Sequence, residues 1–285
     1  MSFKIITDSC CDLTADMIAE LQLGVACLTV EMDGRAYMEG EMTPPALYDH
    51  LRNGKLPKTS AVNPDGWARV IRPALADGQD VLVLAFSSGL SATYQSAVIA
   101  AEELRGEFPD RRIVVIDTLC AALGQGLLVY TAARLRLEGQ TLEEVAAWVE
   151  QHKLHVCHWV TVEDLMHLKR GGRVSAATAV VGTMLSIKPI IRMDDNGKLE
   201  TISKARGRKA AMHYLLDRMA ESFDPAISDT VFIGHGDCQA DAEQLAAEIK
   251  SRFGVKNVVI GYVGAVIGAH TGPGVLVIFH FGKQR

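Results

Sequence analysis

The chain has 285 residues, of which 48% are hydrophobic and 22% are charged. This composition supplies enough apolar side chains for one or two packed domains and excludes a chain that is disordered throughout. The formal net charge is −5, which argues against a protein that binds nucleic acid through many cationic contacts.

Short apolar runs alternate with amphipathic segments in the first half of the chain. Such runs are typical of strands buried on both faces, and residues such as Thr14 and Pro64 suit the first turns of helices. The expected strands are residues 3–7, 25–30, 81–86 and 113–116. The expected helices are residues 14–21, 43–51, 64–75, 91–104, 121–137 and 142–152. This order predicts a mostly parallel sheet with helices on both faces.

The pattern changes near residue 155. Strands are expected at residues 156–160, 230–234, 257–262 and 275–281, and helices at residues 163–168 and 175–185. Between the extended segments 187–192 and 198–203, Asn196-Gly197 predicts a β-hairpin and therefore a mixed sheet. The predicted fold class is α/β, with two α/β domains at residues 1–155 and 156–285.

The cysteines and the apolar stretches indicate a cellular compartment. The six cysteines contain no Cys-x-x-Cys spacing, so buried reduced thiols are expected, as in a reducing cytosol. The N-terminus has no signal-peptide pattern, and no stretch approaches the ~20 apolar residues that span a bilayer. We expect a cytoplasmic protein with at most transient membrane contact.

One segment, residues 87–94, follows a buried strand and opens a helix. Backbone N–H groups at a helix start are unpaired and partly positive, so Ser91, Ala92 and Thr93 mark a candidate anion site. The alternative is a plain N-cap without a ligand, because Ser is common there.

Two further segments carry candidate polar groups. Thr59 and Ser60 offer two hydroxyls in an expected loop, for which a surface turn is the alternative. Residues 268–274 place His270 and Thr271 among three glycines just before the final strand. His270 is able to donate a hydrogen bond to an anion, although the glycines alone also suit a simple turn.

Three cations cluster after the helix expected at residues 163–168, namely Lys169, Arg170 and Arg173. They are compatible with a helix C-terminus followed by a glycine stop. They are equally compatible with a surface that docks a phosphate or a protein partner.

Other signatures are absent from the sequence. It contains no Gly-x-Gly-x-x-Gly, no Walker loop and no Gly-x-Ser-x-Gly. His235 and Asp237 lack a clear third ligand, so no metal site is expected there.

The ordered set of segments resembles the DegV family of bacterial fatty-acid-binding proteins, which includes the fatty-acid carriers of the fatty acid kinase system. The matching pieces are Thr7-Asp8-Ser9, Lys58-Thr59-Ser60, residues 87–91, residues 165–175, Lys188-Pro189 and residues 268–274. Two departures are Ala92, where the family commonly has Gly, and Ala61-Val62, where it usually continues Gln-Pro.

The resemblance implies a DegV-like fold with a long-chain fatty acid bound at the interface of the two domains. It implies a carboxylate held by Thr59 and Ser91 with His270 nearby, and we include Ser60, Ala92, Thr93 and Thr271 as candidate contacts. It also implies that a separate kinase phosphorylates the bound carboxylate and docks near Lys169, Arg170 and Arg173. The carrier then needs no cofactor. Residues 184–187 and 263–267 are expected to line the apolar part of the site.

A second function is compatible with the same residues. Ser91 and His270 supply the nucleophile and base that an acyl- or phosphoryl-transfer enzyme requires. The two functions differ because the enzyme needs turnover by the isolated protein.

Overall fold

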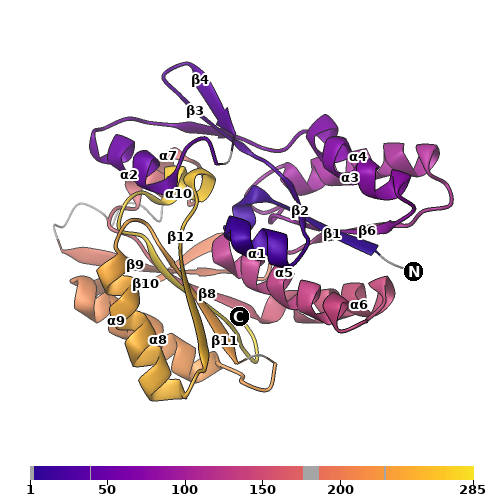
Figure 1. Ribbon diagram of the computed structural model, residues 1–285. Coiled ribbons are helices and arrows are strands. Elements are labelled where there is room, and N and C mark those ends of the chain that lie inside the picture. The colour runs from indigo at the N-terminus through magenta and orange to yellow at the C-terminus, as the bar shows by residue number, and fades with distance from the viewer. Residues whose placement is uncertain (1–2, 39, 176–185, 228) are drawn as a thin grey trace.

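The computed structural model describes residues 3–38, 40–175, 186–227 and 229–285 (Figure 1). The helix predicted at residues 175–185 lies outside this part, apart from Ser175. Within the described part, no helix is both long and apolar enough to cross a bilayer. All six cysteines carry thiol side chains, four of them buried and two half-buried.

The N-terminal sheet is parallel, with strand order β2-β1-β6-β7. Its strands are β1 (Phe3–Asp8), β2 (Gly24–Ala26), β6 (Asp80–Ala85) and β7 (Ile113–Asp117). Alternate residues of β6 enter different apolar clusters: Leu82 and Leu84 on one face, Val81 and Val83 on the other. The predicted parallel sheet with helices on both faces is therefore confirmed.

Each face of this sheet is covered by its own helices. One face packs against α3 (Pro64–Ala76) and α4 (Thr93–Glu107). The other packs against α1 (Ala15–Glu20), α5 (Ala122–Leu137) and α6 (Leu142–His152). Thr14 accepts the N–H of Met17 at the start of α1, as the sequence predicts.

The second sheet is mixed, with strand order β10-β9-β8-β13-β11-β12. Its strands are β8 (Val156–Thr161), β9 (Ile187–Met193), β10 (Leu199–Arg206), β11 (Thr230–His235), β12 (Asn257–Tyr262) and β13 (Leu276–Phe281). The predicted hairpin is present as antiparallel β9 and β10, and Gly197 adopts φ +68° in its turn. Helices α8 (Arg208–Ser222) and α9 (Gln239–Phe253) pack on the outer face of this sheet.

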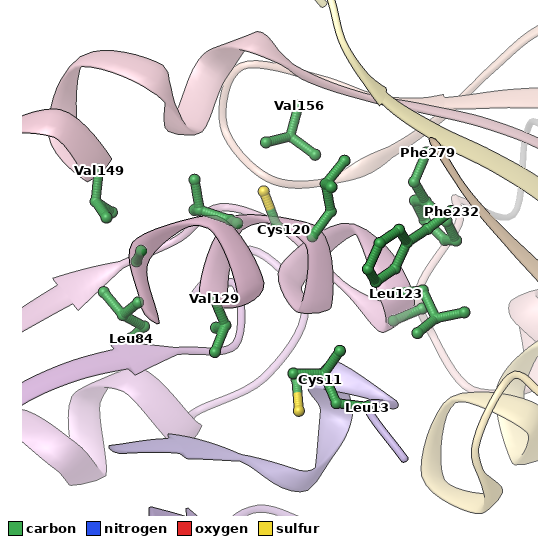
Figure 2. Close-up of a cluster of buried hydrophobic side chains, with 14 of the residues drawn as sticks. Cys11, Leu13, Leu84, Cys120, Leu123, Val129, Val149, Val156, Phe232 and Phe279 are labelled. Carbon is green, nitrogen blue, oxygen red and sulfur yellow. The ribbon is translucent and has the colours of Figure 1, made fainter. Parts of the chain in front are cut away.

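Helix α5 lies between the two sheets. The apolar cluster around it contains Leu84 of the parallel sheet together with Val156 and Phe279 of the mixed sheet, as Figure 2 shows. Two glycines permit this close packing. A Cβ atom at Gly124 would lie 2.3 Å from His158 Nε2, and one at Gly126 would lie 2.4 Å from the carbonyl oxygen of Cys11. The molecule is therefore layered as helix, sheet, helix, sheet, helix.

A third, antiparallel sheet was not predicted. It has the order β4-β3-β5 and consists of β3 (Thr29–Met32), β4 (Arg35–Met38) and β5 (Lys58–Ser60). The single strand predicted at residues 25–30 is wrong, because those residues are shared between β2 and β3 in different sheets. At the break, Leu28 N–H donates to Ser9 Oγ at 3.0 Å, a side chain outside any ladder. The segment 58–60, predicted as a loop, is a strand.

Helix α10 (Ala265–Thr271) packs against β3 and β5 of this small sheet, and α2 (Pro44–Arg52) and α7 (Met166–Arg170) pack against α10. Single turns of 3₁₀ helix are η1 (Ser9–Cys11) and η2 (Lys153–His155). Helix α7 starts three residues later than predicted. The glycine-rich segment 268–274, whose glycines suit a turn, is helical up to Thr271 because its N–H groups continue the α10 ladder, as in Gly272 N–H to Gly268 O at 2.8 Å.

The two large sheets divide the chain in sequence order. Every strand of the parallel sheet precedes residue 155, and every strand of the mixed sheet follows it. The apolar cluster around α5 nevertheless runs from Phe3 to Phe281 without a gap between the sheets. The domain boundary at residues 155 and 156 stays a prediction.

Candidate ligand-binding site

A cavity of about 270 Å³ lies where the three sheets meet. Apolar side chains form most of its wall, including Leu28, Phe86, Val160, Val277 and Phe279. Its polar lining residues are Thr59, Ser91, His158, Arg173, His270 and Thr271. An apolar space with a few polar groups suits a ligand that has a small polar end and a large apolar body.

Thr59 and His270 meet in this wall although 211 positions separate them in the sequence. Thr59 Oγ1 lies 2.8 Å from His270 Nε2. Strand β5 positions the threonine, because Thr59 pairs with Val30 of β3, and α10 positions the histidine. The small sheet and α10 thus join these two candidate residues across the fold.

Ser91 lies at the start of α4, one position earlier than the N-cap residue Ala92. Its Oγ accepts the N–H of Thr93 at 3.2 Å and lies 2.8 Å from Thr93 Oγ1. When Thr93 donates its hydroxyl proton, Ser91 keeps its own proton for a ligand. The first-turn amides of a 15-residue helix add partial positive charge beside it.

The loop that carries Ser91 is held by groups from both large sheets. Asp8, fully buried at the end of β1, accepts the N–H of Phe86 at 2.7 Å. Ser87 Oγ donates to Gly197 O of the β9–β10 hairpin at 2.7 Å. Gly89 packs against the same hairpin, where an added Cβ would lie 2.6 Å from two carbonyl oxygens. The position of Ser91 therefore depends on how the two sheets pack.

The other candidate contacts occupy different places. Ala92 and Thr271 line the cavity, but Thr271 donates its hydroxyl to Ile267 O at 3.2 Å inside α10. Thr93 is fully buried behind Ser91. Ser60 is exposed and is not among the lining residues, because neighbouring residues of a strand face opposite sides.

The three candidate docking cations lie in different environments. Lys169 and Arg170 are exposed near the end of α7, whereas Arg173 is half-buried and lines the cavity. Arg173 Nε donates to Leu90 O at 3.2 Å and a second nitrogen donates to Gly171 O. An added Cβ at Gly171 would lie 2.2 Å from His270 Nδ1, so any larger residue would displace the histidine.

A second pocket of about 410 Å³, lined partly by exposed residues, adjoins the cavity at Thr59 and His270. We call it the outer pocket. It shares Thr59, Arg173 and His270 with the cavity and is also lined by Lys58 and Arg170. None of the described residues that line it is acidic. The wall at Thr59, Arg173 and His270 is therefore shared with a pocket that adds two further cations.

Burial controls the charge of the ionisable groups around the cavity. Burial, assisted by Arg173, lowers the pKa of His270 to about 4. Burial, assisted by Arg285, lowers the pKa of His158 to about 3. Burial raises the pKa of Asp8 to about 7, against the opposing hydrogen bonds from backbone amides and Gln125. Both histidines are neutral at pH 7.

Acid is expected to destabilise the protein below pH 6.5. The pKa values of His158, His270 and His280 fall to about 3, 4 and 4 on folding, from 6.5. The contribution of these three histidines to the free energy of unfolding is fully present above pH 6.5. It is lost as the pH falls, because the histidines of the unfolded chain take up protons that those of the folded protein do not. Asp8 has a raised pKa and therefore stabilises the folded protein as the pH falls. This single group offsets only part of the loss that the three histidines cause.

Denaturant titrations from pH 7 to pH 5 measure this effect. The free energy of unfolding should fall with pH, and His280→Phe should make the slope shallower. His213, half of whose side chain is exposed, provides the control His213→Gln. A free energy of unfolding that is unchanged or higher at pH 5 would contradict the assignment of three neutral buried histidines.

Within residues 3–38, 40–175, 186–227 and 229–285, no group of three or more His, Cys, Asp or Glu side chains is placed to bind a metal ion. The ring of His235 instead lies against Tyr262, with centroids 4.4 Å apart.

The sequence predicted only some of the residues that line the cavity. Val263, Val266 and Ile267 fall in the predicted stretch 263–267, but of residues 184–187 only 186 and 187 are described, and neither lines the cavity. His158 was missed, and Arg173 was assigned only to docking. The alternation of apolar residues along β8 and β13 is the signal that marks the inner face of the sheet, but it does not show that a cavity lies there.

Known proteins resemble this chain along its whole length. A family model described as "Uncharacterised protein, DegV family" matches residues 2–283. A DegV domain-containing protein of Clostridium perfringens is 42% identical, over 99% of this chain and 98% of its own. The chain belongs to the DegV family.

Solved DegV structures share the fold. A fatty-acid-binding DegV family protein of Thermus thermophilus matches with a TM-score of 0.89 and 34% identity, covering 99% of this chain and 100% of its own. A stearic-acid-binding protein of Eubacterium ventriosum matches with a TM-score of 0.88 and 25% identity, covering 99% and 98%. The predicted family and fold class are confirmed.

Proposed function

We propose that this DegV protein binds a long-chain fatty acid by its carboxylate and presents it to a separate kinase, without catalysing a reaction itself. The single observation that supports this most is the cavity, whose polar groups Thr59, Ser91 and His270 border a largely apolar wall. The solved relatives described as fatty-acid-binding proteins add independent support. The six reduced thiols suit a cytoplasmic protein.

The hydroxyls of Thr59 and Ser91 are the proposed donors to the carboxylate. His270 is neutral at pH 7 because its pKa is about 4. In the tautomer with a proton on Nε2 it donates to Thr59 Oγ1, 2.8 Å away. The Thr59 proton is then free for the ligand, as is that of Ser91. Hydrogen bonds to the charged oxygens offset the cost of removing a carboxylate from water.

The acyl chain provides the rest of the affinity. Each methylene buried against apolar wall contributes about 0.8 kcal/mol. Arg173 lines the same cavity and adds positive charge near the carboxylate. Binding in this arrangement needs no covalent bond between protein and ligand. It is therefore suited to a carrier.

Presentation to a kinase is the second part of the proposal. The outer pocket shares Thr59 and His270 with the cavity, and its lining cations Lys58 and Arg170 suit an incoming phosphoryl group. Lys169 and Arg170 are exposed beside it and suit an acidic partner surface. A kinase docked there would reach the carboxylate without displacing the chain.

The geometry favours this proposal over a transferase that uses Ser91 and His270. His270 Nε2 is engaged with Thr59, while Ser91 Oγ bonds to Thr93. A pKa of about 4 also makes His270 a weak base at neutral pH. Ser91 therefore lacks the activated arrangement of a catalytic nucleophile.

Lipid analysis tests the binding function directly. Organic extracts of the purified protein should contain long-chain fatty acid by mass spectrometry, and delipidated protein should bind palmitic or stearic acid on titration. Absence of acyl chains from the extract, together with no binding on titration, would contradict the proposal. Turnover of an acyl phosphate by the isolated protein that disappears in Ser91→Ala would favour the transferase.

Charge reversal tests the docking surface. In Lys169→Glu with Arg170→Glu, acyl-phosphate formation by a fatty acid kinase with ATP and magnesium should fall about 10-fold or more, because like charges now face each other. Fatty acid affinity should change less than about 2-fold, since these side chains are exposed outside the cavity. The matched control is Lys250→Glu with Lys256→Glu, which makes the same charge change at and just beyond the end of α9. Equal rates for both pairs would place the docking surface elsewhere.

A further inference from the structure

His158 faces the cavity from the middle of β8. Its neighbours Cys157 and Trp159 enter the apolar cluster on the outer face of the mixed sheet, so His158 points to the inner face. It pairs across the ladder with Phe279 of β13, and the two rings pack edge to face with centroids 5.2 Å apart. The two side chains form one aromatic wall.

Both ring nitrogens of His158 are already engaged. Nδ1 donates to Val156 O at 3.0 Å, and Nε2 accepts the N–H of Ala121 at 3.2 Å. Gly124 lies so close that an added Cβ would be 2.3 Å from Nε2 and 2.7 Å from Phe279 Cδ1. The ring is therefore fixed in place, and its hydrogen-bonding atoms are already used by the protein rather than offered to the cavity.

This wall lies at the end of the cavity that is remote from Thr59 and His270. Val275, Val277 and Phe279 all line the cavity. Val275 follows closely after α10, which carries His270. At about 3.4 Å per residue, Phe279 lies about 14 Å farther along the strand than Val275. A chain that begins at Thr59 and His270 and follows this face of the sheet meets His158 and Phe279 last.

We propose that His158, braced by Phe279, is the end wall of the acyl cavity, and that it limits ligand length and requires an apolar terminus. This inference rests on the proposed fatty-acid-binding function. A polar group at the far end of the chain would be buried beside nitrogens that already have partners. An ω-hydroxy fatty acid should therefore bind about 10- to 100-fold more weakly than the parent acid.

Replacement of the wall tests the inference. The dissociation constants of saturated acids from lauric to behenic, and of 16-hydroxypalmitic acid, are measured with delipidated protein. In His158→Ala the best-bound chain should be longer by about two carbons or more, since the removed ring leaves room for methylenes. The ω-hydroxy penalty should fall below about 3-fold, because the Ala121 N–H and Val156 O become available to the hydroxyl.

His280→Ala is the matched control. His280 is a fully buried histidine on β13 that lies next to Phe279 and faces the opposite side of the sheet. It accepts the Trp159 Nε1–H at 3.2 Å and bonds to Phe281 O at 2.9 Å. This variant should lose stability but keep the wild-type chain-length preference.

A second variant covers the case in which His158→Ala does not fold. Phe279→Leu shortens the same wall and leaves both hydrogen bonds of His158 intact, so it should shift the preference in the same direction. Wild-type chain-length preference and ω-hydroxy penalty in a folded variant of either kind would overturn the inference. If the wild type binds no fatty acid at all, the proposed function fails instead.

Discussion

The double substitution Thr59→Val and Ser91→Ala is expected to weaken fatty acid binding about 100-fold. Each change removes one hydroxyl from the polar end of the cavity, and a hydrogen bond to a charged group contributes about 1.5–3 kcal/mol. A loss of about 1.4 kcal/mol corresponds to a tenfold change in Kd. In the proposed site the two hydroxyls bind the same carboxylate, so their effects need not add fully. Calorimetric titration with palmitic acid measures the change.

Ser60→Ala is the control for this experiment. Ser60 is next to Thr59 on β5 but is exposed on the other side of the strand. Its removal should leave the Kd within about 2-fold of wild type, as expected of an exposed polar side chain. Similar weakening by Ser60→Ala, or an unchanged Kd in the double variant, would contradict the assigned carboxylate site.

The second large effect is expected from Gly126→Ala. An alanine Cβ in this buried part of α5 would lie 2.4 Å from the carbonyl oxygen of Cys11 and 3.1 Å from Leu13 Cδ2. Because the first of these is a backbone atom, it cannot be relieved by rotating a side chain. Overpacking of this kind costs about 1–3 kcal/mol, which should exceed the ~1 kcal/mol that alanine gains over glycine in a helix. Since the clash with a backbone atom places the cost in the upper half of that range, we expect a net loss of about 1–2 kcal/mol in the free energy of unfolding.

Gly106→Ala on α4 isolates the helix propensity. Gly106 is exposed, and an added Cβ there meets nothing within 4 Å. This variant should gain about 0.5–1 kcal/mol, since only propensity changes. Urea denaturation of both variants gives the comparison. If Gly126→Ala were as stable as Gly106→Ala, the close contact between α5 and η1 would be absent.

The two effects are connected through the turn after β1. Cys11 belongs to η1, which directly follows Asp8, and Asp8 holds the Phe86 amide at the start of the loop that carries Ser91. A displacement of η1 therefore reaches the cavity through backbone contacts. This arrangement explains why the segment from Thr7 to Ser9 accompanies the binding residues. The segment is not among the residues that line the cavity, but it positions Leu28 and Phe86, which are.

Local patterns in the sequence predicted the buried strands and the hairpin correctly. Apolar runs such as residues 81–86 identified the buried strands, and Asn196-Gly197 identified the hairpin, because both signals depend on neighbours in the chain. The resemblance to the DegV family, rather than any local pattern, grouped Thr59, Ser91 and His270 into one site, and all three line one cavity.

Contacts between distant segments could not be predicted from those patterns. Residues 25–30 look like one strand, but the pairing partners of β2 and β3 belong to different sheets. Lys58, Thr59 and Ser60 have the composition of a turn and form a strand only because β3 is available beside them. Likewise, the role of Gly171 depends on the distance to His270, which no spacing in the sequence reveals.

The position of the carboxylate is best measured in a crystal structure of the protein with palmitic acid bound. We expect carboxylate oxygens about 3 Å from Thr59 Oγ1 and Ser91 Oγ, as in a hydrogen bond. We also expect an acyl chain that runs along Val275 and Val277 inside the protein. A carboxylate bound away from Thr59 and Ser91, or a chain lying outside the cavity, would contradict the proposed site.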